Sequence, residues 1–205
     1  MNWDILMIDK LEVRRQIFHS FFGIILALLI YFESIDFLIL LIAAVAGLIL
    51  SMISRKYNIP VITWFLNQFD REKDRKIMPG RGALYYVIGA LIVYGLFITQ
   101  PDGKNIVAAS IIILALGDSA PHFFAHIGKI KHPFNDLKYV EASLAGVIFA
   151  FLGAVWFVGP LEASLASLIA MFVEGIDLKI GLDVDDNLII PVVAAIVIWI
   201  LRMIF

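Results

Sequence analysis

The sequence predicts an all-α polytopic membrane protein, and its composition, its apolar stretches and the placement of its cations all support this class. The 205 residues are 61% hydrophobic and 17% charged, with a mean hydropathy of +0.94. A soluble domain has roughly 45–50% apolar and about 25% charged residues, because much of its surface faces water. The excess of apolar residues must therefore face lipid. We expect one membrane-embedded domain over residues 1–205, since the length leaves no room for a separate soluble domain.

Seven apolar stretches predict the membrane helices, since a spanning helix needs about 20 mostly apolar residues. They are Ile17–Phe32, Phe37–Ile53, Ala83–Thr99, Asn105–Gly117, Ala142–Val158, Leu161–Val173 and Leu188–Phe205. The fourth and sixth are short and adjoin polar clusters. Interrupted membrane helices often mark places where polar side chains meet a cavity. We therefore expect about seven transmembrane helices and a polar site beside the short ones.

The Lys and Arg residues predict the orientation of the chain. If the seven spans alternate in direction, only Lys104 and Arg202 of the sixteen cations fall on one side. Cytoplasmic loops are enriched in Lys and Arg. We therefore expect the N-terminus in the cytoplasm and the C-terminus outside, in the cell membrane of a prokaryote. The first apolar stretch lacks a small-residue cleavage pattern, so we expect it to stay in the mature protein.

The longer connections all fall on the expected cytoplasmic side, at Ser54–Gly82, Asp118–Glu141 and Glu174–Asn187. The outer turns are too short to hold a site. The first connection contains Pro60 and several aromatic residues, which favours a helix at the membrane surface. Alternatively, its cations face a polyanion, with the glycines beside Arg81 allowing close approach to a phosphate.

Ionisable residues in or beside membrane spans are costly and point to function by default. Glu12, Arg15 and His19 share a helix face at three- and four-residue spacing. Taken alone, these residues are more simply explained as an ordinary intrahelical ion pair and a satisfied core histidine.

Asp118 falls where an apolar stretch ends and Pro121 is expected to interrupt the helix, although an Asp there could merely cap the next segment. His122 and His126 have the spacing of a metal-binding pair. Without an obvious third ligand, packing or phosphate contact is favoured over zinc.

Polar residues also precede the fifth and the last spans. Lys138, Glu141 and Ser143 open the fifth, as part of a site or as interfacial anchors. The residues before the last span are Glu174, Asp177, Lys179, Asp183, Asp185, Asp186 and Asn187. Asp183 and Asp185 read as solvated, whereas Asp186 and Asn187 border an apolar helix that Pro191 is expected to interrupt.

The clusters together indicate one kind of chemistry. Carboxylates with an amide suit Mg²⁺, which prefers hard oxygen ligands. Arg and Lys suit phosphates. Their combination beside a membrane interior is what phosphoryl transfer to a lipid requires.

These motifs resemble those of the CTP-dependent polyprenol kinase family, which includes dolichol, phytol and farnesol kinases and the CTP-dependent diacylglycerol kinase of yeast. The pattern E-x-x-R-K-x-x-H matches Glu12, Arg15 and His19, with Gln16 in place of Lys. The L-G-D segment matches Leu116, Gly117 and Asp118, with Gly128 and Lys129 at the downstream G-K. The K-x-x-E-G-S segment matches Lys138, Glu141 and Ser143, with Ala142 in place of Gly. The ending E…D-N-L-x-x-P matches Glu174, Asp186, Asn187, Leu188 and Pro191.

The resemblance implies transfer of the γ-phosphate of CTP to the hydroxyl of a membrane isoprenoid alcohol of the dolichol type. In this hypothesis Asp118, Asp186 and Asn187 hold Mg²⁺. The groups that contact the nucleotide are Arg15, Arg81, Lys129, Lys138, Ser143 and Asn187. Glu141 or Asp186 accepts the proton of the alcohol. The residues expected to be lipid-facing or structural are Glu12, His19 and Glu174. Gln16 removes one possible phosphate cation, and Ala142 restricts the backbone beside Glu141.

Two other functions remain open. A CTP-dependent cytidylyltransferase would use similar groups, but the K-D…G-H-G-G-x-x-D-R-x-D signature of phosphatidate cytidylyltransferases is missing. An ion-coupled transporter would need ionisable groups across the membrane, and the outer half of each span has almost none. No nucleic-acid partner is expected. The identity of the lipid alcohol and the oligomeric state stay open.

Overall fold

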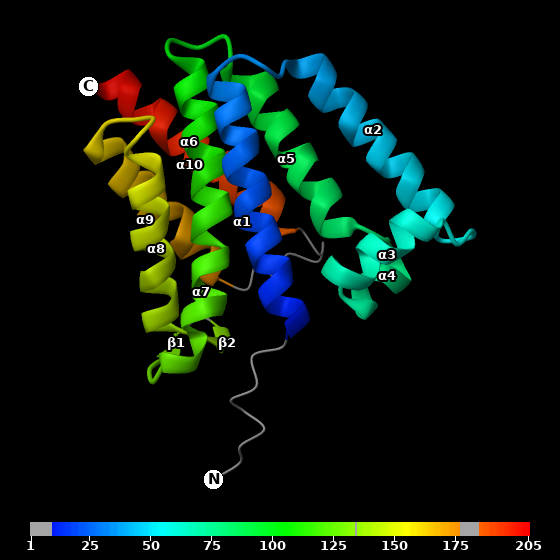
Figure 1. Cartoon of the computed structure of the whole chain (residues 1–205). Helices are drawn as coiled ribbons and strands as arrows, with labels where there is room; N and C mark the ends of the chain where they lie inside the picture. Colours follow the sequence, from blue (N-terminus) through cyan, green and yellow to red (C-terminus); the bar gives the residue numbers. More distant parts are fainter. Residues whose placement is uncertain (1–9, 134, 177–184) are drawn as a thin grey trace.

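A computed structural model describes residues 10–133, 135–176 and 185–205 of the chain, which are nearly all helical (Figure 1). The long helices are α1 (Lys10–Tyr31), α2 (Phe37–Ser54), α5 (Arg81–Phe97), α6 (Gly103–Gly117), α8 (Val140–Ala154), α9 (Pro160–Gly175) and α10 (Asp186–Ile204). The short elements are α3 (Pro60–Phe69), α4 (Glu72–Ile77), α7 (Ser119–Phe124), the 3₁₀ turn η2 (Ala125–Ile127) and an antiparallel pair, β1 (Lys131–His132) with β2 (Asn135–Tyr139). The all-α class that the sequence predicts is confirmed, apart from this small hairpin.

Each of the seven apolar stretches forms a helix. Four helical segments are long and apolar enough to cross a membrane: Lys10–Tyr31, Phe37–Ser54, Gly103–Ile127 and Asp186–Ile204. Large apolar side chains cover the outside of the molecule, including Phe21, Leu38 and Ile42 at 62%, 59% and 59% exposure. Surface of this kind cannot face water, so the chain is integrated in a membrane.

Helix α6 is the centre of the bundle. Every residue from Ile106 to Ala115 is buried, and α6 packs against α1, α5, α8, α9 and α10. Helix α2 packs against α5 and leans away from the rest of the bundle, so that it carries α3 and α4 to one side (Figure 1). The site described below forms where the ends of α6, α9 and α10 meet.

Two helices continue through prolines that the sequence predicts to interrupt them. Helix α10 includes Pro191, and Asp118 has helical backbone angles between α6 and α7. A proline removes one backbone N–H, so it frees the carbonyl four residues earlier without necessarily ending the helix. The expected end of the fourth apolar stretch at Gly117 is confirmed, since α6 ends there and α7 begins at Ser119. The predicted break at Pro191 is wrong, because α10 continues through this residue.

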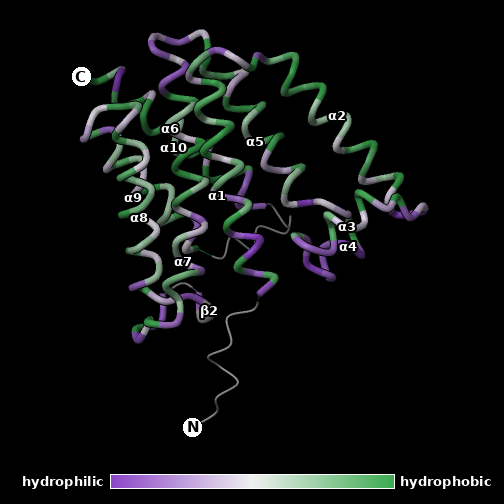
Figure 2. The backbone as a smooth tube through the Cα atoms, viewed as in Figure 1, coloured by the Kyte–Doolittle hydropathy of each residue, from purple (hydrophilic) through white to green (hydrophobic). Residues whose placement is uncertain are grey.

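The two ends of the bundle differ in charge. The charged end, defined as the end where α1 begins and α6 finishes, holds α3, α4 and the β1–β2 hairpin, and hydrophilic residues gather there (Figure 2). The opposite end holds the short turns between α1 and α2, α5 and α6, and α8 and α9. Among the described residues, the cations of the opposite end are Lys104 and Arg202. Asp177, Lys179 and Asp183 lie outside the described residues.

Candidate functional site

A cavity of about 690 Å³ opens at the charged end, between α1, α3, α5, α7, α8, α9 and α10. The site residues predicted from the sequence that line this cavity are Arg15, His19, Arg81, Asp118, Lys138, Ser143, Glu174, Asp186 and Asn187. They come from segments far apart in the chain. The fold therefore brings most of the predicted site together in one place.

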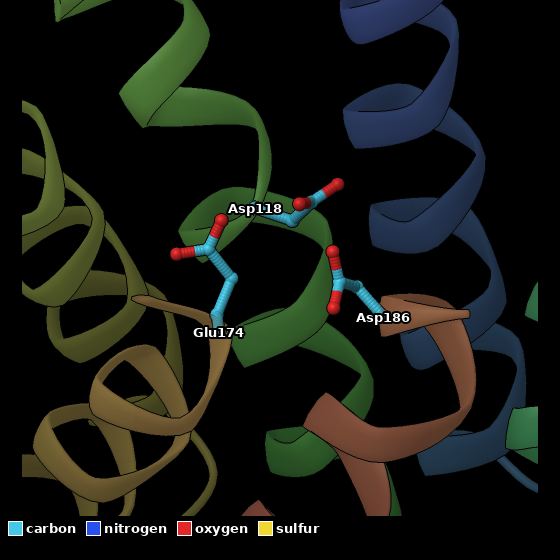
Figure 3. Close-up of side chains that lie close together, drawn as sticks. All are labelled: Asp118, Glu174 and Asp186. Atoms are coloured by element: carbon cyan, nitrogen blue, oxygen red, sulfur yellow. The ribbon is translucent and has the colours of Figure 1, made fainter. Parts of the chain in front are cut away.

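Three carboxylates converge in the cavity. Asp118, Glu174 and Asp186 each offer an oxygen, and these oxygens lie within 4.8 Å of one another. Figure 3 shows the three side chains pointing toward a common space from the ends of α6, α9 and α10. The sequence analysis predicts Asp118 and Asp186 together and counts Glu174 among the lipid-facing or structural residues, whereas the structure puts Glu174 in this cluster.

Glu174 is the most deeply placed of the three, with 5% of the residue exposed. Its Oε1 accepts a hydrogen bond of 2.5 Å from Lys138 Nζ, which also donates to the Glu174 carbonyl. Its Oε2 has no hydrogen-bond partner among the described residues. A buried carboxylate oxygen without a partner is costly, so this atom indicates a ligand that would complete the site.

Two proline–glycine contacts set the positions of Asp118 and Asp186. Pro121 frees the carbonyl of Gly117, and Pro191 frees that of Asn187. A Cβ added at Gly146 would lie 2.9 Å from the Gly117 oxygen, and one added at Gly89 would lie 2.3 Å from the Asn187 oxygen. Each freed carbonyl thus lies against a glycine of a neighbouring helix. Because glycine has no side chain, the two backbones can approach closely enough for Cα–H contacts to the carbonyl oxygen.

These contacts fix the backbone beside two acidic residues at the end of the apolar bundle. Asp118 directly follows the freed carbonyl of Gly117, and Asp186 directly precedes that of Asn187. The close approach of α8 to α6 and of α5 to α10 holds both segments in place. The positions of the two carboxylates therefore depend on Gly146 and Gly89, which carry no chemistry themselves.

The cluster has the donor set for a divalent cation. Its ligand atoms are carboxylate oxygens, which are the hard ligands that Mg²⁺ prefers at about 2.0–2.1 Å. Three carboxylates this close repel one another unless a cation intervenes. Lys138 Nζ forms an ion pair with Glu174, and His19 Nε2 lies 3.6 Å from Asp118. A small oxygen-seeking cation fits this arrangement.

Asn187 lies in the first turn of α10, next to the first turn of α5. Its Nδ2 donates to Asp185 Oδ1 at 2.7 Å and to the Gly82 carbonyl at 3.4 Å, while its Oδ1 has no partner among the described residues. Asp185 also accepts the backbone N–H of Asn187 and lies 3.4 Å from Arg81. Burial raises the pKa of the Asp185 carboxyl, against the opposing effect of these donors. The amide oxygen of Asn187 is thus available as a ligand, as the sequence analysis predicts.

The Glu12 carboxylate contacts several basic side chains at the edge of the cavity. It accepts hydrogen bonds from Arg15 and Gln16 through Oε1 and from Arg71 through Oε2, at 2.9 Å for the last. His122 Nδ1 lies 3.6 Å from the same carboxylate. Glu12 does not line the cavity, whereas Arg15, Arg71 and His122 do. Its role is to hold these side chains at the edge of the site.

The structure does not bring Glu141 or Lys129 into the cavity lining. The Glu141 carboxylate accepts the backbone N–H groups of Lys129 and Ile130 at 3.1 and 3.2 Å. This bond ties the start of α8 to the loop before β1. Of the two residues predicted to accept the alcohol proton, Asp186 is therefore the one that lines the cavity.

The two histidines and the two departures from the kinase pattern are also placed by the structure. His122 lines the cavity, but His126 Nδ1 lies 2.8 Å from the Phe123 carbonyl instead, so the two histidines do not act as a pair. Gln16, which stands where the polyprenol kinase pattern has Lys, is 1% exposed and donates a hydrogen bond to Glu12. Ala142 lies in the first turn of α8, where an ordinary helical residue fits.

Sequence reasoning missed two acidic residues that serve the site. Asp185 caps α10 and pairs with Arg81, although it reads as solvated from the sequence. The Asp-x-Asn spacing of a helix N-cap is the signal that could have identified it. Asp70 is 9% exposed and accepts the N–H of Gly80 at 2.9 Å, so it fixes the turn before Arg81. No local pattern distinguishes Asp70 from a solvated acid.

The fold and the site define a helical membrane protein with a cluster of three carboxylates in a cavity. No protein-family model matches the chain, and no solved structure matches it significantly. The uncharacterized protein MJ1137 of Methanocaldococcus jannaschii is 30% identical over 191 residues, which cover 91% of this chain and 92% of that protein. The chain belongs to the same family as this protein.

Proposed function

We propose that the protein is a lipid alcohol kinase that transfers the γ-phosphate of CTP to the hydroxyl of a membrane isoprenoid alcohol. The observation that carries the proposal is the convergence of Asp118, Glu174 and Asp186 in a cavity also lined by Arg15, Arg81 and Lys138. This set of groups suits a phosphate bound with a divalent cation. The choice of CTP over other nucleotides depends on the resemblance to the polyprenol kinases.

The proposal includes a membrane topology. Seven spans, with the charged end in the cytoplasm, would place the cavity where a nucleotide can enter from water. The excess of Lys and Arg at that end supports this orientation. A lipid alcohol keeps its hydroxyl near the interface while its chain stays in the bilayer, so both substrates would reach the same site.

In the proposed mechanism the chain acts mainly by positioning and charge neutralisation. Asp118, Glu174 and Asp186 would hold Mg²⁺, which neutralises the phosphates of the bound nucleotide. Arg15, Arg81 and Lys138 contact the remaining phosphate oxygens. Asp186 accepts the proton as the alcohol oxygen bonds to the γ-phosphorus and the bond to the β-phosphate oxygen breaks. The products are a lipid phosphate, CDP and a proton.

The test is phosphorylation of a polyprenol by purified protein in nanodiscs, with CTP labelled in its γ-phosphate. Asp118→Asn and Asp186→Asn are expected to lower the rate by about 100- to 1000-fold, because each removes charge stabilisation at the reacting phosphate. Glu162→Gln, at the opposite end, is the matched control and should keep full activity. Full activity in both Asp variants would contradict the proposal. Release of pyrophosphate instead of CDP would identify a cytidylyltransferase.

A further inference from the structure

Four phenylalanines from α1 and α3 form an aromatic wall along the same cavity: Phe18, Phe22, Phe65 and Phe69. The Phe18 ring lies 5.1 Å from Phe65, 4.8 Å from Phe69 and 6.0 Å from Phe22 between centroids. These spacings are those of favourable ring contacts. The wall joins two helices that are separated in sequence by α2.

The aromatic wall leads directly to the acid cluster. Phe22 packs edge-on against Tyr86 at 5.4 Å, and Tyr86 packs against His19 at 4.7 Å. His19 Nε2 in turn lies 3.6 Å from Asp118.

The cavity therefore has the aromatic wall at one side and the three carboxylates at another, with Tyr86 and His19 between them. Charged residues after Phe69 also line it, among them Arg71 and Lys73. A ligand that contacts both the wall and the carboxylates needs an apolar body and a polar head.

Helix α3 separates the aromatic wall from the exterior of the molecule. Phe65 and Phe69 turn toward α1, while Val61 and Trp64 on the same helix are 76% and 61% exposed. Phe18, Phe65 and Phe69 are only partly buried and lie outside the main hydrophobic core. Aromatic surface that faces a cavity, and not a core, gains free energy when an apolar group covers it.

We infer that the aromatic wall holds the acceptor's hydrocarbon chain beyond the unit that carries the hydroxyl, with the hydroxyl directed past His19 toward Asp118. This inference rests on the proposed function and names the part of the site that selects a lipid acceptor. Flat isoprenoid units with methyl branches match the faces and edges of phenylalanine rings. Phe65 and Phe69 then determine how well the enzyme uses a long alcohol.

The test compares a long polyprenol with a short, water-soluble prenol as acceptors. Phe65→Ala is expected to raise the KM for the polyprenol about tenfold, which corresponds to about 1.4 kcal/mol of lost contact. The KM for CTP and the kcat/KM for the short prenol should stay unchanged. Trp64→Ala is the matched control, because it removes an aromatic from the exposed face of the same helix and should change none of these values.

Two kinetic results would overturn the inference. A rise in the KM for CTP alone would show that the wall stacks the nucleotide base. An equal loss with both acceptors would show that Phe65 only supports the fold.

A binding measurement keeps the inference separate from the proposed function. A long-chain alcohol with a diazirine just beyond the unit that carries the hydroxyl is irradiated with the full-length protein in nanodiscs, and the labelled peptides are mapped by mass spectrometry. Labelling of α1 and α3 that excess polyprenol suppresses would support the aromatic wall even if no phosphorylation occurred. Labelling confined to other helices would contradict the inference, even in an active kinase.

Discussion

Acidic and basic side chains are arranged differently at the two ends of the bundle. At the opposite end, Arg202 pairs with Glu162 at 2.8 Å and Lys104 pairs with Glu33 at 2.7 Å, so each acid has its own cation. At the charged end, Asp118, Glu174 and Asp186 share one space. An ion pair between two side chains can serve the fold alone, whereas convergent carboxylates remain costly without a ligand. Convergence, and not charge itself, distinguishes the site.

The sharpest test of this difference uses two glutamates of one helix. Glu174→Gln removes a member of the acid cluster, while Glu162→Gln breaks the ion pair with Arg202. Both substitutions remove one charge and one cation partner. We expect Glu174→Gln to weaken Mn²⁺ binding at least about 100-fold, since even indirect support of a metal ligand is worth 10- to 100-fold. Glu162→Gln should bind as the wild type does, measured by titration calorimetry in detergent.

Equal Mn²⁺ affinity in the two variants would show that the acid cluster is not a cation site. It would also remove the main distinction between the two ends.

A second test moves the acid cluster without changing its charge. In Gly89→Ala the added methyl group would lie 2.3 Å from the Asn187 carbonyl, so the start of α10 must shift. We expect the rate of the proposed phosphoryl transfer to fall about 10- to 100-fold, because small misplacements of reacting groups have effects of this size. In the control, Gly47→Ala, the new methyl group meets only the end of the Leu84 side chain at 3.2 Å. Unchanged rates in both variants would show that the packing of α5 does not position Asp186.

The Glu12 network predicts an effect on stability as well as activity. Glu12→Gln weakens hydrogen bonds to Arg15 and Arg71, and we expect it to lower the free energy of unfolding by about 1–3 kcal/mol. A smaller rise in the KM for CTP should accompany the loss, because Arg15 is no longer held. Denaturant titration in detergent measures the first effect, and Glu72→Gln on exposed α4 is the control. An unfolding midpoint equal to that of the control would contradict the assigned role.

The smallest effect is expected at the opposite end. Lys104 lowers the pKa of Glu33 by donating a hydrogen bond to it. Any stabilisation from this pair is therefore present above the ordinary pKa of Glu and is lost as the pH falls through the lowered value. Both side chains are exposed, so solvent screens the pair. We expect Lys104→Ala to leave the thermal unfolding midpoint unchanged at pH 7 and in acid, and a clear shift at pH 7 would contradict this.

The sequence by itself determined the helical class, the membrane environment and the segments that hold the site. Composition and apolar periodicity are sufficient for this, because a lipid-facing helix must be apolar along its whole length. Asp118 and Asp186 could also be predicted, since an ionisable residue that borders an apolar span is rare without a function.

Only the tertiary structure decided which acids meet. Glu174 joined Asp118 and Asp186, while Glu141 turned toward the backbone of Lys129 and Ile130. Local sequence cannot distinguish these two glutamates, because each lies near the charged end of an apolar helix. The choice depends on how α6, α8 and α9 pack, and that packing is set by contacts between segments distant in the chain.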